Sequence, residues 1–517
     1  IVQFEWGGDA DGERLDLAFA KQRVADRKEW LRGHAAGSQP LDFSRGRLTF
    51  SEFVDTELIQ FSAYNNERSI PSAIDGLKPG QRKVLHGCLK RKSGEEMKVA
   101  QLSGSVAETT CYHHGEASLQ QTIIGMAQGF VGAHNLPLLQ AIGQFGSRMQ
   151  GGRDAASPRY IFTRLSEYTR LLFPAADDDL LHYLEEDGTP VEPQYFVPII
   201  PMALVNGQEG IGTGWSTSLP NYSPLAIIDV LLHRLESTSN NVLPPELVPW
   251  YRGFTGTVQH VSNDDAGYAI FQCSGLVQRR KDKSLRVTEL PVGCWTEDYK
   301  TFLDKLCDQN VLTRYTENHT DTSIDFVLFP TKSTKFFDKN TKLDEILRLH
   351  KTIRLSNMHL FNAQAQLRRF SQPHEIIDEH FDVRFGLYDR RLKAQMAHLT
   401  SRLADSKLKE DFLDRVVSGE FDLQTLSRMR LAEFIRTHPQ NNTALEEGAA
   451  LKRADALLSL PLSQLGRGSL DRLKSEIGRL ETEAKRASSL RVEQMWIEEL
   501  QTLRTAIEPV LQNPPHN

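Results

Sequence analysis

Residues 98–130 read KVAQLSGSVAETTCYHHGEASLQQTIIGMAQGF, the pattern of two helices joined by a short turn. The apolar periodicity predicts one helix over 98–109 and a second over 116–130, with TCYHHG between them, which is a helix–turn–helix spacing. A polar run at 120–122 (QQT) lies near the start of the second helix, where a DNA-recognition helix presents such side chains. An ordinary αα-hairpin is the simpler interpretation of the spacing alone.

Farther along, residues 141–163 read AIGQFGSRMQGGRDAASPRYIFT, a run rich in glycine and arginine. The glycines permit positive φ and let backbone N–H groups approach an anion. Arg148, Arg153 and Arg159 add positive charge. A tyrosine that attacks a phosphodiester needs such surroundings, because a pKa of about 10 makes it a weak nucleophile until cations favour the phenolate. Tyr160 is therefore a candidate nucleophile, although most tyrosines serve packing or lie on the surface.

The turn of the helix–turn–helix contains adjacent histidines in the run YHHGE (112–116). Metal ligation is disfavoured, because adjacent side chains point in different directions and no carboxylate at helical spacing completes a site. Two interpretations remain open. His113 and His114 can be structural residues at a helix N-terminus, or they can contact a phosphate and supply a proton to a leaving oxygen.

A third glycine-rich run, GQEGIGTGW (207–215), places Ile211 between Gly210 and Gly212. An apolar side chain on such a loop is poorly placed for a core. It could act as a wedge between DNA base steps, which kinks a duplex. The alternative is a tight loop that turns one isoleucine inward.

Composition limits the possible classes of protein. The chain has 517 residues, 39% of them hydrophobic and 25% charged, which predicts three or four domains with sizeable cores. The net charge of −6 excludes a uniformly basic coat. Nevertheless, residues 68–92 hold seven lysines and arginines against one acid, a local basic patch. No apolar run is long enough to cross a membrane, so we expect no membrane partner. Five scattered cysteines favour a reducing compartment.

The rest of the chain changes character twice. Prolines and β-branched runs over 185–335 predict an α/β domain with an antiparallel or mixed sheet. From about 341 the pattern is helical, and apolar residues at 470, 473, 477, 480, 484 and 487 form a coiled-coil seam. We predict a multidomain α+β protein: a helical DNA-binding domain, an α/β domain, and a long antiparallel coiled-coil arm with a small helical tip.

Together these segments resemble the breakage–reunion core of a eukaryotic-type type IIA DNA topoisomerase. The resemblance covers nearly the whole chain. It is carried by ERSIPSAIDGLKPGQRKVLHGCLKR (67–91), KVAQLSGSVAE (98–108), YHHGE (112–116), QFGSRMQGGRDAASPRYIFT (144–163) and PMALVNGQEGIGTGWST (201–217).

The resemblance implies roles for individual residues. Tyr160 matches the tyrosine that forms a 5′-phosphotyrosine link, Arg159 the arginine that stabilises the transition state, and His114 the histidine near the reacting phosphate. Ile211 matches the isoleucine that intercalates and bends the duplex. The remaining matches are expected DNA contacts: Arg68, Lys78, Lys83 and His113. The arginines of the glycine-rich run, Arg148 and Arg153, are also expected to contact DNA.

The implied activity is transient double-strand cleavage, passage of a second duplex and religation, in a homodimer joined at the winged-helix gate and at a C-terminal gate. Mg²⁺ and ATP are the implied cofactors of the whole enzyme. The ATPase region and the acidic metal-binding domain of the family are not recognisable in this sequence. We therefore expect no cofactor and no metal ligands in this chain, and poor cleavage by the chain alone. The alternative is a non-catalytic DNA-bending or chromosome-scaffold protein on the same fold.

The resemblance also predicts domain boundaries and location. We expect a connector at 1–60, a winged-helix DNA-gate domain at 61–180, an α/β tower at 181–340, and the coiled-coil arm with its dimerising gate at 341–517. We expect the nucleus, with the mitochondrion as the alternative.

Overall fold

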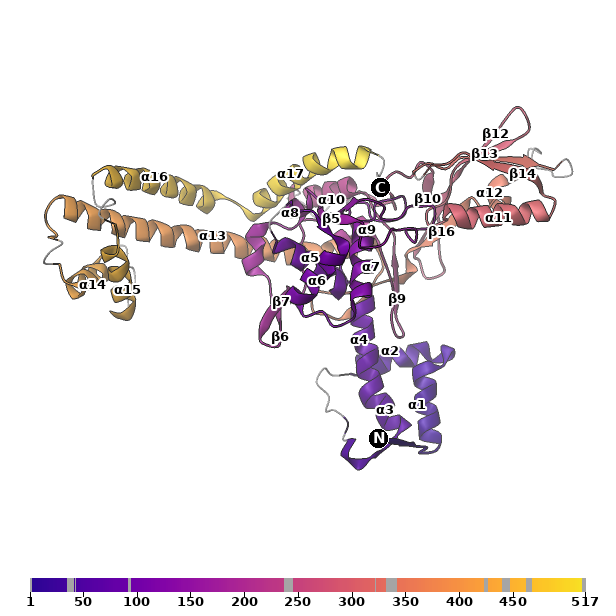
Figure 1. Cartoon of the computed structure of the whole chain (residues 1–517), viewed down its shortest axis with the longest axis horizontal. Coiled ribbons are helices and arrows are strands. Elements are labelled where there is room, and N and C mark those ends of the chain that lie inside the picture. Colours follow the sequence, from indigo (N-terminus) through magenta and orange to yellow (C-terminus); the bar gives the residue numbers. More distant parts are fainter. Residues whose placement is uncertain are drawn as a thin grey trace. The chain divides into compact units, whose positions relative to one another are not determined.

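The computed structural model describes residues 2–34, 41, 43–91, 94–236, 245–320, 322–331, 342–422, 426–438, 447–461 and 467–513 (Figure 1). The chain forms two compact units. The first comprises Ile1–Arg384 together with Ile497–Asn517, and the second is Phe385–Trp496. The whole is a mixed helical and sheet protein of several domains, as predicted.

Three helices and a small sheet form the centre of the first unit (Figure 1). They are α5 (Pro79–Leu89), α6 (Val99–Thr110) and α7 (Glu116–Ala127), so both predicted helices are confirmed. The predicted second helix is three residues shorter, because the backbone turns extended at Gln128. Helices α5 and α6 pack closely, since a Cβ added to Gly87 would lie 2.8 Å from Val106.

The small sheet has the order β3 (Met97–Lys98), β5 (Phe162–Leu165) and β4 (Leu139–Ile142), and its pairs are antiparallel. Helices α5 to α7 with this sheet have the arrangement of a winged helix. The sheet places the residues just before β5, which include Tyr160, beside the start of α6.

The N-terminal region packs around α4 (Ile59–Ser69). Strand β1 (Gln3–Glu5) pairs in parallel with β2 (Arg47–Thr49). Helices α1 (Asp9–Phe19) and α2 (Val24–Arg32) are separate, because Ala20 adopts an extended backbone between them.

Two antiparallel sheets occupy the region 257–354. One has the order β10 (Thr257–Asn263), β11 (Ala269–Ser274), β16 (His350–Arg354). The other has the order β12 (Leu276–Arg279), β13 (Leu285–Glu289), β15 (Phe326–Pro330), β14 (Leu312–Glu317), and α11 (Thr296–Asp308) packs on it through Tyr299 and Leu303. The pairing of the described strands corrects the expected mixed sheet to an antiparallel one.

The second unit is helical, as predicted. The chain runs out along α13 (Pro373–Val417) and returns along α16 (Arg467–Ser489), with α14 (Arg428–Thr437) and α15 (Glu447–Leu458) at the tip (Figure 1). Leu470, Leu473 and Ile477 are buried in one cluster with Phe412, which confirms the predicted antiparallel arm. Helix α17 (Val492–Gln512) leads back into the first unit.

Candidate nucleic-acid interface

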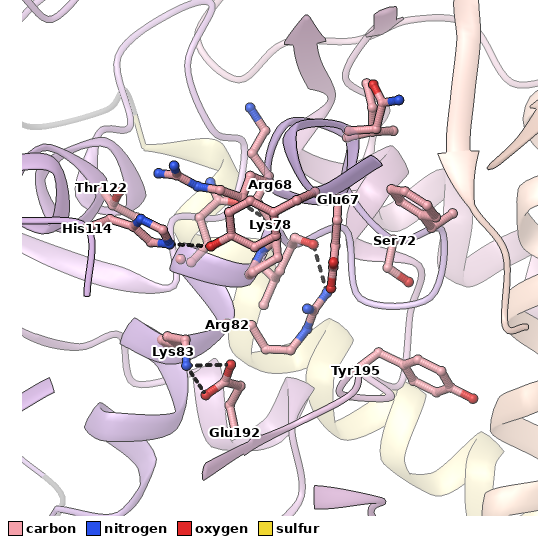
Figure 2. A pocket seen from close by; sticks show the side chains of 18 of the residues that line it. Glu67, Arg68, Ser72, Lys78, Arg82, Lys83, His114, Thr122, Glu192 and Tyr195 are labelled. Carbon is pink, nitrogen blue, oxygen red and sulfur yellow. Dashed lines mark hydrogen bonds and ion pairs between the residues drawn. The ribbon is translucent and has the colours of Figure 1, made fainter. Parts of the chain in front are cut away.

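A large groove of about 1770 Å³ crosses the first unit beside the winged helix. Its lining includes the sequence-predicted residues Arg68, Lys78, Lys83, His113 and His114. Arg68 ends α4, the two lysines begin α5, and the histidines lie in the turn between α6 and α7. Figure 2 shows four of these side chains gathered on one wall. The fold therefore brings together residues that are up to 46 positions apart in the sequence.

The two lysines of α5 are held differently. Nζ of Lys78 donates to the carbonyl of Glu209 at 2.8 Å, and burial lowers the pKa of Lys78. Nζ of Lys83 donates to the carbonyl of Thr110 at 2.7 Å and forms an ion pair with Glu192 at 3.0 Å (Figure 2). Glu192 thus neutralises much of the Lys83 charge, and Lys78 keeps its charge available to a ligand.

His114 is the more enclosed of the two histidines. Its Nε2 hydrogen-bonds to the hydroxyl of Tyr64 (Figure 2), and Tyr64 lies one helical turn before Arg68 on α4. Burial and the nearby Arg68 lower the pKa of His114 below 6.5, so the ring is neutral at neutral pH. Nε2 of His113 lies 3.2 Å from a carboxylate oxygen of Glu186. Both side chains face the groove, so their structural role does not remove them from a ligand's reach.

Tyr160 is presented outward on a rigid support. Its side chain is 76% exposed. The backbone on either side is pinned to the start of α6, because the N–H of Val99 donates to the carbonyl of Ile161 at 3.0 Å and the N–H of Ala100 donates to Pro158 at 3.1 Å. Arg159 is also exposed. Neither Arg159 nor Tyr160 lines the groove that contains His114.

The two other arginines of the glycine-rich run have different environments. Arg153 is 71% exposed in its side chain and hydrogen-bonds to the carbonyl of Gln150 at 3.0 Å. Arg148 is 4% exposed and forms an ion pair with Glu289 at 2.7 Å. A charge buried in this way cannot reach a ligand, so the expected DNA contact by Arg148 is corrected to a structural role.

Ile211 ends strand β8 (Gln208–Ile211), which forms a hairpin with β9 (Ser216–Leu219). The side chain is 85% exposed, so the alternative of an inward isoleucine is wrong. Flanking glycines allow the hairpin to lie directly on α4: a Cβ on Gly210 would be 2.1 Å from the carbonyl of Ser69, and one on Gly212 would be 2.2 Å from Asn66. The isoleucine is therefore an apolar knob on a fixed base.

Three residues of the groove wall were not identified from the sequence. Tyr64 could have been found, because it is four residues before Arg68 and so shares its helical face. Glu186 and Glu192 carry no such signal, since they belong to the hairpin β6 (Tyr183–Glu186) and β7 (Thr189–Pro193), about a hundred residues beyond the lysines they contact.

Two other kinds of site were sought in the described part of the chain. Among the described residues, no group of three or more histidine, cysteine or acidic side chains could hold a metal ion. Nor do the described helices include one with the length and apolar character needed to span a membrane.

Comparison with known proteins identifies two matching families. Residues 68–501 match the DNA gyrase/topoisomerase IV family model, and residues 1–66 match the C-terminal associated domain of TOPRIM. The mitochondrial DNA topoisomerase 2 of Dictyostelium discoideum is 39% identical over 98% of this chain. DNA topoisomerase 2-beta of Mus musculus is 40% identical over 84% of this chain. The chain spans 39% and 27% of the lengths of these two relatives.

One solved structure resembles the whole chain. The DNA-binding, cleavage and re-ligation domain of Plasmodium falciparum topoisomerase II is 37% identical and superposes with a TM-score of 0.82. The match covers 98% of this chain and 71% of that structure.

Proposed function

The chain belongs to the DNA gyrase/topoisomerase IV family, and from that membership we propose that it is the DNA-cleavage core of a type II topoisomerase. It binds a duplex, cuts both strands, lets a second duplex pass and reseals the break, which relaxes and decatenates DNA. One observation carries the proposal: Tyr160 is exposed and rigidly mounted next to Arg159 on a winged helix whose flank is a basic groove.

The proposed chemistry is a transesterification. The phenol of Tyr160 loses its proton to water, and its oxygen bonds to a backbone phosphorus. The bond from that phosphorus to the 3′ oxygen breaks, and the 3′ oxygen takes up a proton. Arg159 stabilises the added negative charge in the transition state. Religation is the reverse reaction, and it needs no external energy because the phosphotyrosine ester conserves that of the broken bond.

The groove residues position the duplex. Arg68 and Lys78 bind backbone phosphates. His114, neutral because burial and Arg68 lower its pKa, donates a ring N–H to the reacting phosphate, and Tyr64 fixes the orientation of that ring. His113 and Lys83 line the same wall next to Glu186 and Glu192 and make weaker contacts. Arg153 extends the basic surface near Tyr160.

We propose that the chain acts as a homodimer, joined near the winged helix and at the tip of the helical arm. The reason is that the groove with His114 does not include Tyr160 of the same chain, so a second copy can supply the tyrosine. Mixing Tyr160→Phe chains with His114→Ala chains tests this idea. Mixed dimers with one intact composite site should form a covalent DNA adduct, although neither variant forms one alone. Absence of rescue contradicts the shared site.

Mg²⁺ and ATP are proposed as cofactors of the whole enzyme on the strength of the family alone. The described residues do not include a cluster fit to hold Mg²⁺, so no step above depends on a metal held by this chain. For location we propose the nucleus and keep the mitochondrion as the alternative, since two of the relatives are named mitochondrial. Imaging a fluorescent fusion of the full-length protein against a mitochondrial dye distinguishes the two.

The experiment that tests the proposed function is covalent trapping. Duplex DNA and a magnesium salt are incubated with the chain, alone and extended at its N-terminus, and the reaction is stopped with denaturant. Protein-linked DNA is expected, and Tyr160→Phe should abolish it while DNA affinity stays nearly unchanged. DNA that is bound and bent but never linked in either form would instead favour the scaffold protein.

A further inference from the structure

A second cluster of positive charge surrounds Trp215, at the foot of the hairpin that carries Ile211. Nζ of Lys28 lies 4.4 Å from the centre of the Trp215 ring, and the guanidinium carbon of Arg32 lies 5.2 Å from it. Both cations come from α2, and Trp215 is only 6% exposed. The aromatic ring is thus a fixed platform that holds two cations in place.

The platform is continuous with the hairpin. Gly214 has a φ of +74°, and a Cβ there would lie 3.5 Å from Arg27 of α2. The backbone N–H of Gly212 donates to the carbonyl of Trp215 at 2.9 Å. Helix α2 therefore packs directly against the end of the hairpin, and its cations have a fixed position relative to Ile211.

A third cation reaches the same place from a distant part of the chain. Arg369 lies on β18 (Leu367–Phe370), which pairs with β17 (Met358–Phe361). His359 of β17 makes an edge contact with Trp215 at 5.1 Å between ring centres. Burial lowers the pKa of Lys28, and the nearby Arg32 and Arg369 lower it further. The three cations are thus close enough to repel one another.

These charges are only partly neutralised within the chain. Arg32 pairs with Glu29 of its own helix. In the described ranges, no ion pair joins Lys28 or Arg369 to a carboxylate, and Arg369 instead donates to the carbonyl of Ser356 at 2.7 Å. Holding like charges together costs free energy that a bound anion recovers. The arrangement is typical of an anion site.

The groove indicates which anion fits. Arg32 and Trp215 line the same groove of about 1770 Å³ as Lys78 and His114. A single small anion would fill a minor part of that space. A nucleic-acid duplex presents a phosphate about every 3.4 Å along each strand and can contact both groups of cations at once.

We propose that Lys28, Arg32 and Arg369 form a second phosphate-binding site, which holds the backbone of the duplex that Ile211 bends. The inference rests on the proposed function, in that the groove holds a DNA duplex. Because the three cations flank the foot of the hairpin, phosphates bound there draw the duplex against the isoleucine. Contacts at this site therefore favour the bent duplex as well as the bound one.

Three single variants of the whole chain test the site: Lys28→Gln, Arg369→Gln and the control Lys21→Gln. Lys21 is an exposed cation that lies just before α2. The affinity for a labelled duplex is measured by fluorescence anisotropy over a range of salt concentrations. Each of the first two variants should bind several-fold more weakly and lower the slope of log K against log salt by about one unit. Lys28→Arg should keep the wild-type slope, and the control should change neither quantity.

A duplex with single neutral methylphosphonates locates the contact. Neutralising the phosphate that Lys28 binds should weaken binding by the wild type and have little further effect on Lys28→Gln, a coupling expected only for direct partners. Melting curves matched to those of the wild type exclude misfolding as the cause.

The outcomes separate the two proposals. If the wild type binds the duplex, and both Lys28→Gln and Arg369→Gln bind and bend it as the control does, the site is overturned and the proposed function stands. If inorganic phosphate binds in a Lys28-dependent manner while duplex binding ignores Lys28, the site serves small anions and the inference is wrong. If the wild type binds no duplex at all, the proposed function itself fails.

Discussion

The hydroxyl of Tyr64 hydrogen-bonds to Nε2 of His114, so the side chain of one helix fixes the ring that faces the groove. Arg68, on the same helix, helps to lower the pKa of that ring. We predict that the pKa of His114, measured by NMR titration, lies below 6.5. Arg68→Gln should raise it, because loss of a nearby positive charge favours the protonated imidazole. Arg91→Gln is the control and should leave the His114 pKa unchanged. A pKa at or above 6.5 in the wild type would contradict the account.

Ile211→Ala should reduce bending of a bound duplex, measured by energy transfer between dyes at its two ends. The reason is that the 85% exposed side chain is free to enter a base step and its removal leaves no wedge. Stability should change by less than about 0.5 kcal/mol, as for other surface substitutions. Ile346→Ala, at a side chain 41% exposed, is the matched control. Equal bending by both variants would show that Ile211 is no wedge.

Arg148→Ala should destabilise the protein rather than weaken DNA contacts alone. It leaves the buried carboxylate of Glu289 without its ion partner, which costs about 3–5 kcal/mol. The double variant with Glu289→Ala should recover part of that loss, because no unpaired charge remains. Urea unfolding of the single and double variants measures the effect. A single variant as stable as the wild type would restore Arg148 as a surface cation.

Burial lowers the pKa of His380 to about 3, and its Nε2 donates to the carbonyl of Pro198 at 2.8 Å. Below a pH of about 6.5 the unfolded chain binds a proton that the folded chain does not. The free energy of unfolding should therefore fall with pH between about 6.5 and 3, by up to about 1.4 kcal/mol per pH unit from this group.

His380→Gln keeps a donor for Pro198 and should flatten that pH dependence. The exposed His398→Gln is the control and should keep the wild-type slope. The measurement is urea unfolding at two pH values inside the window. Identical slopes in both variants would mean that His380 does not titrate as its burial requires.

The local elements of the site are predictable from the sequence. The helix–turn–helix at 98–130 follows from apolar periodicity and a turn of fixed length, and Ile211 is conspicuous because glycines flank it. The helical arm follows from its 3-4 spacing. The break at Ala20 was missed, because nothing in the apolar pattern of 16–30 marks the extended residue that separates α1 from α2.

Long-range partners are not predictable in this way. Glu192 is 109 residues from Lys83, and Glu289 is 141 residues from Arg148. Periodicity reports which face of a helix is buried and says nothing of which charge meets it. Consequently the sequence alone presented Arg148 and Lys83 as equal DNA contacts. The structure shows one fully buried and the other largely neutralised.

The most direct test of the central claim is the polarity and position of the covalent link. A duplex labelled at either the 3′ or the 5′ end of one strand is incubated with the protein and a magnesium salt, then denatured. For a 5′-phosphotyrosine, the 3′-labelled fragment should remain attached to protein, the 5′-labelled fragment should be released, and mass spectrometry should place the adduct on Tyr160. Attachment of the 5′-labelled fragment, or an adduct on another residue, would contradict the account.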